Sequence, residues 1–441
     1  MTEHIGVDLA AAKMPRRRRI PLHLVSVLLF KALHLRGATI IPLQLAWRRL
    51  QIALSSGLKR TERLADFAAR RGDGAAATKF WRELEQQQPH RADWPVKIAQ
   101  VAKERGDLDV AERILLDARE RGVEDERIEL ELLRCTRLSR RSNSAVADAE
   151  AIVADPEASP AKVFAAALHL VTQNRLEGAR VGFVRILGDD GHGPLASGQL
   201  AAVELLAELQ SRGRPDIPGR VTPAQNSMIV REPSSDTLVV GFALPEGTLG
   251  LPLNAAHAML SSAGVNGLYL YDSQQVFHLS GTDRFGPGYR AMIDGVRALA
   301  AEIGARRLVT VGGSGAGYTA IRAGIDLEAD GVVAFSPGTV MNPGANPGLA
   351  RSAHTLLRLR ERALPMMANL RPLVRDRKSC ARIEIYYGAE NSRDIMHASN
   401  LAGLRGVTLH EVPGLARHDC FTEMARLGYR DLLKTFPAPS P

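Results

Sequence analysis

A strand, a glycine-rich turn and a helix follow one another without a break in the second half of the chain. Residues 307–311 predict a buried strand, the turn reads Gly312-Gly313-Ser314-Gly315-Ala316-Gly317, and helix-forming residues begin at Tyr318. Turns of this kind often bind phosphate. A Walker loop, however, needs Lys and then Ser or Thr after its last glycine, where Tyr318 and Thr319 stand here. A dinucleotide fingerprint needs glycine at its third position, which is Ser314. The residues therefore exclude both phosphate-binding interpretations.

The same turn resembles the nucleophile elbow of the α/β-hydrolase family. That family places a serine between small residues in the pattern Gly-x-Ser-x-Gly, because the turn is strained and larger side chains would clash. Gly312 and Ser314 match the pattern, and Ala316 replaces the last glycine with a residue that is still small. The resemblance implies that Ser314 is a catalytic nucleophile. It also implies that the backbone N–H of Gly315 stabilises the negative charge of the reacting oxygen.

A serine hydroxyl needs a base, and the resemblance implies that the base is a histidine near the C-terminus. His418 follows the predicted strand 407–412 by a few residues and precedes the last predicted helix, as the family order requires. His354 and His397 lie in predicted helices, and His410 lies within the strand. His418 is therefore the candidate base.

The acid of the triad is expected after the predicted strand 382–387. Many family members carry it three residues after a glycine equivalent to Gly388, where this chain has Asn391. Glu390 and Asp394 remain as candidates. Asp394 is favoured because its surroundings resemble the acid-bearing helix start of some members, although an acidic residue in a first helical turn also has a purely structural use.

A second donor to the reacting oxygen should come from the loop after the predicted strand 237–243. The candidates are Phe242, Ala243 and Leu244, and Phe242 is preferred. Residues 338–378 form an insertion rich in Leu, Arg and Met at a place where family members often carry a lid. No metal-ligand cluster or cofactor fingerprint is present, so the sequence predicts neither a metal nor a cofactor.

Short apolar segments that alternate with helical ones predict a doubly wound, mainly parallel α/β-hydrolase sheet in residues 225–441. The predicted strands are 227–230, 237–243, 267–271, 307–312, 331–335, 382–387 and 407–412.

An internal period of 34 residues marks the first half of the chain, which is rich in Ala, Leu, Glu and Arg. It relates Ala77, Ala111, Ala145 and Ala179, and it also relates Trp81 to Leu115 and Phe183. Residues 58–210 resemble a degenerate tetratricopeptide array, in which each unit is a pair of antiparallel helices that cross at small residues. Two interpretations stay open: a concave surface that binds a partner protein, or a scaffold that only packs on the catalytic domain. The fold class is thus multidomain, with a helical repeat array before an α/β domain and a linker at 211–223.

The net basic charge of the chain is concentrated at its N-terminal end, in an arm at residues 1–57 and the few residues that follow it. The first 60 residues hold eleven Lys and Arg but only two acidic residues, which accounts for the whole net charge of +9. Nucleic acid is therefore not an expected partner of the folded body. The apolar segments within residues 16–50 are too short to span a bilayer, and we expect them either to contact an anionic membrane surface or to pack on the protein.

The sequence predicts a serine hydrolase that cleaves an ester or thioester, and the same apparatus would serve an acyltransferase acting on a glycan or a protein-bound substrate. The alternative is a non-catalytic adaptor that binds a partner protein through the helical repeats. Three cysteines, Cys135, Cys380 and Cys420, make no disulfide framework. This favours a cytoplasmic protein that is peripherally associated with membranes if the arm binds lipid.

Overall fold

The structure is a computed structural model of the 441-residue chain. It describes residues 51–52, 55, 57–70, 73–104, 107–139, 143–211, 227–244, 248–261, 264–272, 276–340, 369–378, 381–418 and 420–421. The predictions for the N-terminal arm, the linker at 211–223 and most of the 338–378 insertion lie outside these residues.

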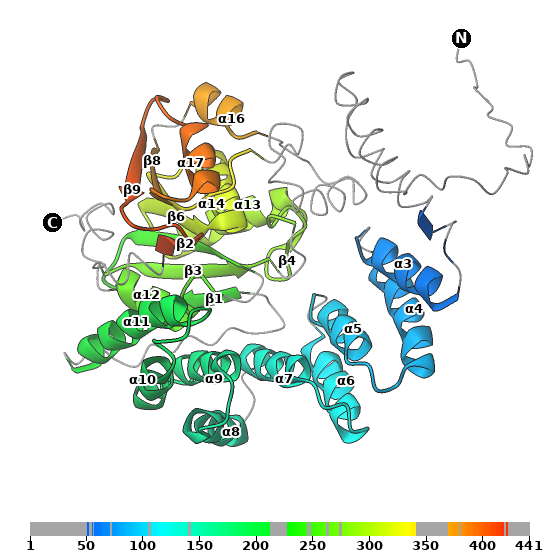
Figure 1. The fold of residues 1–441 in the computed structure, drawn as a ribbon. Coiled ribbons are helices and arrows are strands. Elements are labelled where there is room, and N and C mark those ends of the chain that lie inside the picture. The colour runs from blue at the N-terminus through cyan, green and yellow to red at the C-terminus, as the bar shows by residue number, and fades with distance from the viewer. Residues whose placement is uncertain are drawn as a thin grey trace, which may run out of the picture. The chain divides into compact units, whose positions relative to one another are not determined.

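Consecutive helices form the first half of the described chain, and most of them pack against the next helix along the chain (Figure 1). Their bounds are α3 Gly57–Arg70, α4 Gly74–Gln87, α5 Asp93–Glu104, α6 Leu108–Glu120, α7 Glu126–Ser139, α8 Asn143–Ala154, α9 Pro160–Thr172, α10 Leu176–Arg185 and α11 Gly193–Ser211. Side chains cap some of them: Asp73 accepts a hydrogen bond from the Ala76 N–H, and Ser159 accepts one from the Lys162 N–H, with Pro160 at the first helical position.

Most positions related by the 34-residue period are buried where the structure describes their side chains. Ala77, Ala111 and Ala179 are fully buried, as are the larger Leu115 and Phe183. Small residues on these faces allow neighbouring helix backbones to approach closely, and the larger apolar residues fill the space between them. The period therefore marks the packed faces of the helices. The tetratricopeptide assignment itself stays an interpretation.

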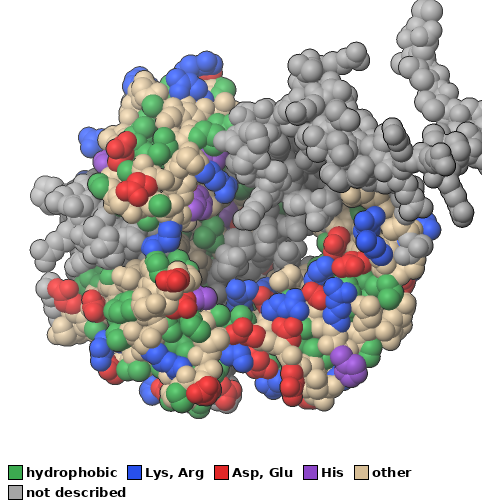
Figure 2. All heavy atoms as spheres, in the orientation of Figure 1, with side chains coloured by type: hydrophobic (Ala, Val, Ile, Leu, Met, Phe, Trp, Pro, Cys, Tyr) green, Lys and Arg blue, Asp and Glu red, His purple; other side chains and the backbone are tan. Residues whose placement is uncertain are grey.

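Charged side chains of both signs are interspersed over the helices on the face shown in Figure 2. Many are paired between helices: Arg127 contacts Asp93 at 2.8 Å, and Arg121 contacts the buried Glu85 at 2.7 Å. Because each of these charges already has a partner within the chain, the pairs do not define a patch of one sign on this face.

A seven-stranded sheet forms the second half of the described chain, and every segment predicted as a strand belongs to it. Its order is β1-β3-β2-β6-β7-β8-β9. The bounds are β1 Ser227–Val230, β2 Thr237–Ala243, β3 Asn266–Tyr271, β6 Arg307–Gly313, β7 Gly331–Phe335, β8 Arg382–Gly388 and β9 Val407–Val412. Only β1 is antiparallel to its neighbour, so the prediction of a mainly parallel sheet is confirmed. A two-residue pair, β4 Gly281–Thr282 and β5 Gly286–Pro287, lies apart from it.

Helices cover both faces of this sheet (Figure 1). They are α12 Leu253–Ser261, α13 Tyr289–Glu302, α14 Ser314–Asp326, α16 Arg371–Asp376 and α17 Ser392–Ser399. The chain passes from β2 to β3 in one direction along the sheet and then returns past β2 to β6 and onward to β9. The order thus reverses between β2 and β6. The carboxyl ends of strands at such a reversal are the usual place for a ligand site in an open α/β sheet.

The hydrophobic core runs from the helices into the sheet. One cluster of buried residues extends from Ala149 of α8 through Leu205 of α11 to Val311 of β6 and Phe421. A separate cluster between Ala65 and Cys135 fills helices α3 to α7. The domain boundaries predicted at 210 and 225 stay a prediction, and the apolar packing is continuous across them.

Two of the three cysteines, Cys135 and Cys420, are described, and both are buried. Within the described ranges, no helix has the length and apolar character needed to cross a membrane.

Candidate active site

Ser314 stands on the sharp turn between β6 and α14. Its φ of 53° is a left-handed conformation that non-glycine residues seldom adopt, and such strain is often found at functional sites. The turn depends on Gly312, where a Cβ atom would lie 2.3 Å from the carbonyl oxygen of Ala316. A side chain at position 312 would therefore force the backbone of the turn apart. Ala316 itself is buried without such a conflict, so the departure from the family pattern is accommodated.

His418 lies between Ser314 and Asp394, although the three residues are far apart in the sequence. Its Nε2 is 2.8 Å from Ser314 Oγ, and its Nδ1 is 2.6 Å from Asp394 Oδ1. With the proton on Nδ1, the ring donates to the carboxylate and Nε2 accepts from the serine hydroxyl. The structure thus brings together the three residues that the sequence predicts as nucleophile, base and acid. This arrangement can withdraw a proton from the serine as it attacks.

Ser336 provides a further contact to the acid, which sequence reasoning missed. Its Oγ donates to Asp394 Oδ2 at 2.7 Å, and its backbone N–H donates to Tyr386 O at the end of β8. Both Asp394 and Ser336 are buried, with 1% and 3% of their surfaces exposed. Each oxygen of the buried carboxylate therefore has a donor, His418 on one side and Ser336 on the other. These bonds fix the orientation of the acid and stabilise its charge. The only sequence signal for Ser336 is its place directly after strand β7.

Asn391 connects the loops that carry the acid and the base. Its Oδ1 accepts from the N–H groups of Arg393 and Asp394 at the start of α17, and its Nδ2 donates to Ala416 O at 3.0 Å. Ala416 lies two residues before His418. The asparagine thus caps the helix that carries Asp394 and also ties that helix to the histidine loop. Sequence reasoning noticed this residue only because it is not an acid.

Glu390, the alternative acid, is exposed, and no side-chain hydrogen bond to His418 is present in the described structure. His410 contacts Glu384 at 2.7 Å and stacks on Tyr386, so it is engaged within the sheet. His354 lies outside the described residues. Of the candidate acids and bases, the structure brings Asp394 and His418 to Ser314.

His397, one turn after Asp394, connects α17 to the loop that follows β7. It is 1% exposed, and its Nδ1 accepts hydrogen bonds from the N–H groups of Thr339 and Val340 at 3.2 and 3.3 Å. Those bonds require an unprotonated Nδ1. Burial, with a smaller contribution from the charge of Arg393, lowers the pKa of His397 to about 4. The neutral imidazole therefore holds together the two segments that carry Ser336 and Asp394.

We expect the free energy of unfolding to fall as the pH drops from 6.5 to 4, in part because of His397. The pKa of this residue is about 4 in the folded chain and 6.5 in its ordinary state, so in this range the unfolded chain binds more protons. The loss from one such residue approaches about 1.4 kcal/mol per pH unit. Urea unfolding across this range should show a shallower fall in His397→Gln, which keeps an acceptor but does not titrate. Burial also lowers the pKa values of His257 and His278, so some dependence should remain. Equal slopes for the two proteins would contradict the expectation.

The residues expected to bind the reacting oxygen lie on either side of the switch between β2 and β6. Gly315 is the second residue of α14, directly after Ser314. Phe242 lies one residue before the end of β2, paired with Gly312 of β6 and with Leu270 of β3. The N–H of Leu244 donates to Thr248 O at 2.8 Å, so it is already engaged. This bond counts against Leu244 as the second donor; Phe242, which is paired with strands on both sides, and Ala243 stay predictions.

No family model matches the chain, and no curated protein matches it. Solved structures do resemble it. An α/β hydrolase from the metagenome of sediments of the Mar Chica lagoon in Morocco is 12% identical, with 47% of this chain and 93% of that chain covered and a TM-score of 0.34. Esterase B from Lactobacillus rhamnosis, inhibited by a tributyrin phosphonate, is 14% identical, with 56% and 93% covered and a TM-score of 0.37. A proline iminopeptidase from Mycobacterium smegmatis is 11% identical, with 49% and 96% covered and a TM-score of 0.32.

These neighbours are distant, and the description of the site does not depend on them. The strand order, the reversal between β2 and β6 and the serine on the turn after β6 are features of this chain itself. They correspond to the arrangement in which an α/β-hydrolase sheet exposes a nucleophilic serine.

Proposed function

We propose that the chain is a serine hydrolase that cleaves an ester or a thioester through Ser314, His418 and Asp394. The observation that carries the proposal is the hydrogen-bonded series from the buried carboxylate of Asp394, through both nitrogens of His418, to the hydroxyl of Ser314. The carboxylate end is buried, whereas Ser314 is partly exposed, as an attacking group must be.

The proposed reaction proceeds in two halves. In the first, Ser314 Oγ attacks the substrate carbonyl carbon while His418 Nε2 takes the hydroxyl proton and then gives it to the leaving alcohol or thiol. Asp394 holds the imidazole in the required tautomer and stabilises its protonated form. In the second half, His418 Nε2 takes a proton from water as the water oxygen attacks the acyl carbon. The bond between that carbon and Ser314 Oγ then breaks, His418 returns the proton to Oγ, and the acid is released. The N–H groups of Gly315 and Phe242 are the proposed donors to the negatively charged oxygen.

Acyl transfer is a close variant of this reaction, in which an alcohol such as a sugar hydroxyl replaces water in the second half. The triad residues serve both reactions equally. A helical array before the catalytic half is compatible with a large substrate, and on this basis we propose a glycan or an acylated protein as the ester-bearing partner.

Labelling with a fluorophosphonate probe tests the proposal directly, because the probe reacts with an activated serine. The wild-type protein should be labelled, whereas Ser314→Ala and His418→Ala should not. Folding of each variant is checked by circular dichroism. A panel of p-nitrophenyl esters of increasing acyl length would then show which acyl groups are accepted. A folded wild-type protein that is neither labelled nor active on any ester would contradict the proposal and favour the alternative, an adaptor that binds a partner through the helices.

A further inference from the structure

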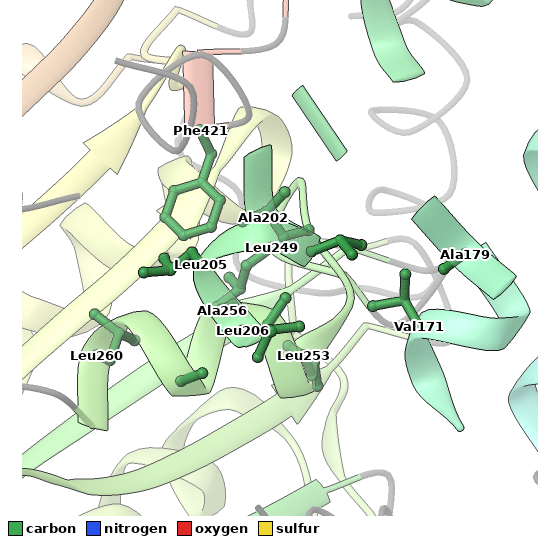
Figure 3. Packing of buried hydrophobic residues seen from close by; sticks show 14 of the residues in the cluster. Val171, Ala179, Ala202, Leu205, Leu206, Leu249, Leu253, Ala256, Leu260 and Phe421 are labelled. Atoms are coloured by element: carbon green, nitrogen blue, oxygen red, sulfur yellow. The ribbon is translucent and has the colours of Figure 1, made fainter. Parts of the chain in front are cut away.

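Helix α11 lies against the part of the catalytic half that follows β2. Its apolar face, together with the loop after β2, helix α12 and the segment after His418, forms one buried cluster (Figure 3). The residues that Figure 3 labels in this contact are Ala202, Leu205 and Leu206 of α11, with Leu249, Leu253 and Phe421. Helix α11 is thus packed directly against the loop after β2 and against the segment after His418. The first of these segments follows the candidate oxyanion residues, and the second follows the candidate base.

A side-chain hydrogen bond joins α11 to the loop after β2 within this contact. Gln199 of α11 is 6% exposed, and its Nε2 donates to the carbonyl oxygen of Gly250 at 3.0 Å. Its Oε1 is buried, and within the described structure it has no hydrogen-bond partner. A buried amide oxygen without a partner costs stability. The net contribution of Gln199 to folding is therefore small, whereas the geometry that its Nε2 imposes on Gly250 is specific.

Gly250 occupies a constrained position. Its φ is 82°, and a Cβ atom at this residue would lie 3.0 Å from the Cβ of Phe421. Thr248 connects the segment around Gly250 to the end of β2. It pairs with Pro252, and its carbonyl oxygen accepts a hydrogen bond from the N–H of Leu244. The position of Gly250 therefore bears on the end of β2, where Phe242 and Ala243 are the remaining candidates for the second oxyanion donor.

Gly250 is also connected, through Phe421, to the segments that carry the base and the support of the acid. Phe421, which packs on Gly250, lies three residues after His418. Its ring meets Phe335 with the centroids 4.5 Å apart, and Phe335 directly precedes Ser336, the donor to Asp394. A shift of Gly250 would consequently move the end of β2, the loop that carries His418 and, through Phe421 and Phe335, the residue that donates to Asp394.

We propose that Gln199 is a positioning residue for the active site, and that through it α11 holds the loop after β2 in its catalytic geometry. The helices are then part of the hydrolase's active-site support and not only a docking array or an inert cover. This inference rests on the proposed serine hydrolase, because the loop matters catalytically only if it supports an oxyanion donor.

The test compares Gln199→Met with Leu209→Ala in the full-length chain. Met has nearly the length of Gln and lacks the donor, so we expect its melting temperature to stay within a few degrees of wild type. Its kcat on p-nitrophenyl esters should fall about tenfold with little change in KM, since complete loss of an oxyanion donor costs about 10²- to 10³-fold. Leu209 is buried at the other end of α11 in the same cluster. Leu209→Ala should lower the melting temperature by more than Gln199→Met does, because it leaves a cavity in the core, yet leave kcat near that of wild type.

Hydrogen exchange provides a readout that does not require activity. The amides from Thr248 to Leu253 should exchange faster in Gln199→Met than in wild type, whereas those of β8 should be unchanged. An unchanged kcat in an active enzyme, unchanged exchange of these amides, or a uniform rise in exchange across α11 and α12 would overturn the proposal. If fluorophosphonate fails to label the wild-type protein, the proposed function fails first. The exchange experiment would then still decide whether Gln199 fixes the loop.

Discussion

Ser314→Ala should lower the turnover of the best p-nitrophenyl ester by about 10⁴- to 10⁶-fold, with little change in KM. Alanine removes the attacking oxygen but fits the turn, since its methyl group takes the place of the serine Cβ. The left-handed φ of 53° at this position is equally strained for both residues, so the fold should be preserved. Steady-state kinetics at saturating ester, with unfolding monitored in parallel, would measure the effect.

His418→Ala should cause a loss of similar size, and the double variant should be hardly worse than either single one. The two residues act in the same proton transfer, so removing the second has little further effect once the first is gone. His410→Ala is a suitable control, because His410 is a partly exposed histidine that contacts Glu384 away from Ser314. Losses that multiply in the double variant, or a Ser314→Ala protein that keeps more than about a tenth of the activity, would argue against a triad mechanism.

The sheet could be predicted from the sequence because its signals are local. Each strand is a short apolar run bounded by turn residues, and the segments of β2 and β7 are buried along nearly their whole length, as parallel strands require. The order of the strands is different, since it depends on which segments pair across long distances. The sequence predicted a mainly parallel sheet but no order for its strands.

The candidate triad could be predicted from the sequence because its signals are also local. Ser314 belongs to a local motif, and the order of acid and base along the chain follows from that motif. The roles of Ser336 and His397 could not be predicted, because they depend on contacts between side chains from separate strands and helices. A serine after a strand and a histidine in a helix have no pattern that distinguishes them from surface residues. The structure explains both through the acid: Ser336 donates to Asp394, and His397 holds the loop that carries Ser336.

The packing of the helices against the sheet also cannot be predicted from a sequence pattern. The 34-residue period marks buried positions such as Ala77 and Ala179, but a period within one region carries no information on its contacts with another. A Pro- and Gly-rich segment between the two regions favours an interpretation as separate domains. The shared core and the bond from Gln199 to Gly250 instead connect α11 with the catalytic half. On the proposal made for Gln199, this contact would couple the helices to catalysis even if they also bind a partner.

Asp394→Asn should lower kcat by about 10⁴-fold, because an amide can no longer hold His418 in the tautomer that accepts the serine proton. Glu390→Gln should stay within about twofold of wild type, since an exposed carboxylate without a contact to the base has little electrostatic effect on it. The two substitutions are comparable, because each removes one negative charge, and the positions are only four residues apart, Glu390 just before α17 and Asp394 in its first turn. Measuring kcat for both variants on one ester therefore identifies the acid.

The reverse result, with most activity lost in Glu390→Gln and retained in Asp394→Asn, would assign the role to Glu390. It would also require the loop to rearrange, since in the structure it is Asp394 that lies 2.6 Å from His418 Nδ1 and accepts from Ser336. Ser336→Ala distinguishes a rearranged loop from the one described. If Asp394 is the acid, losing the donor to its second oxygen should reduce kcat by about tenfold, in line with the weight of one charge-assisted hydrogen bond of about 1.5 kcal/mol. If Glu390 is the acid, the same substitution should leave kcat unchanged.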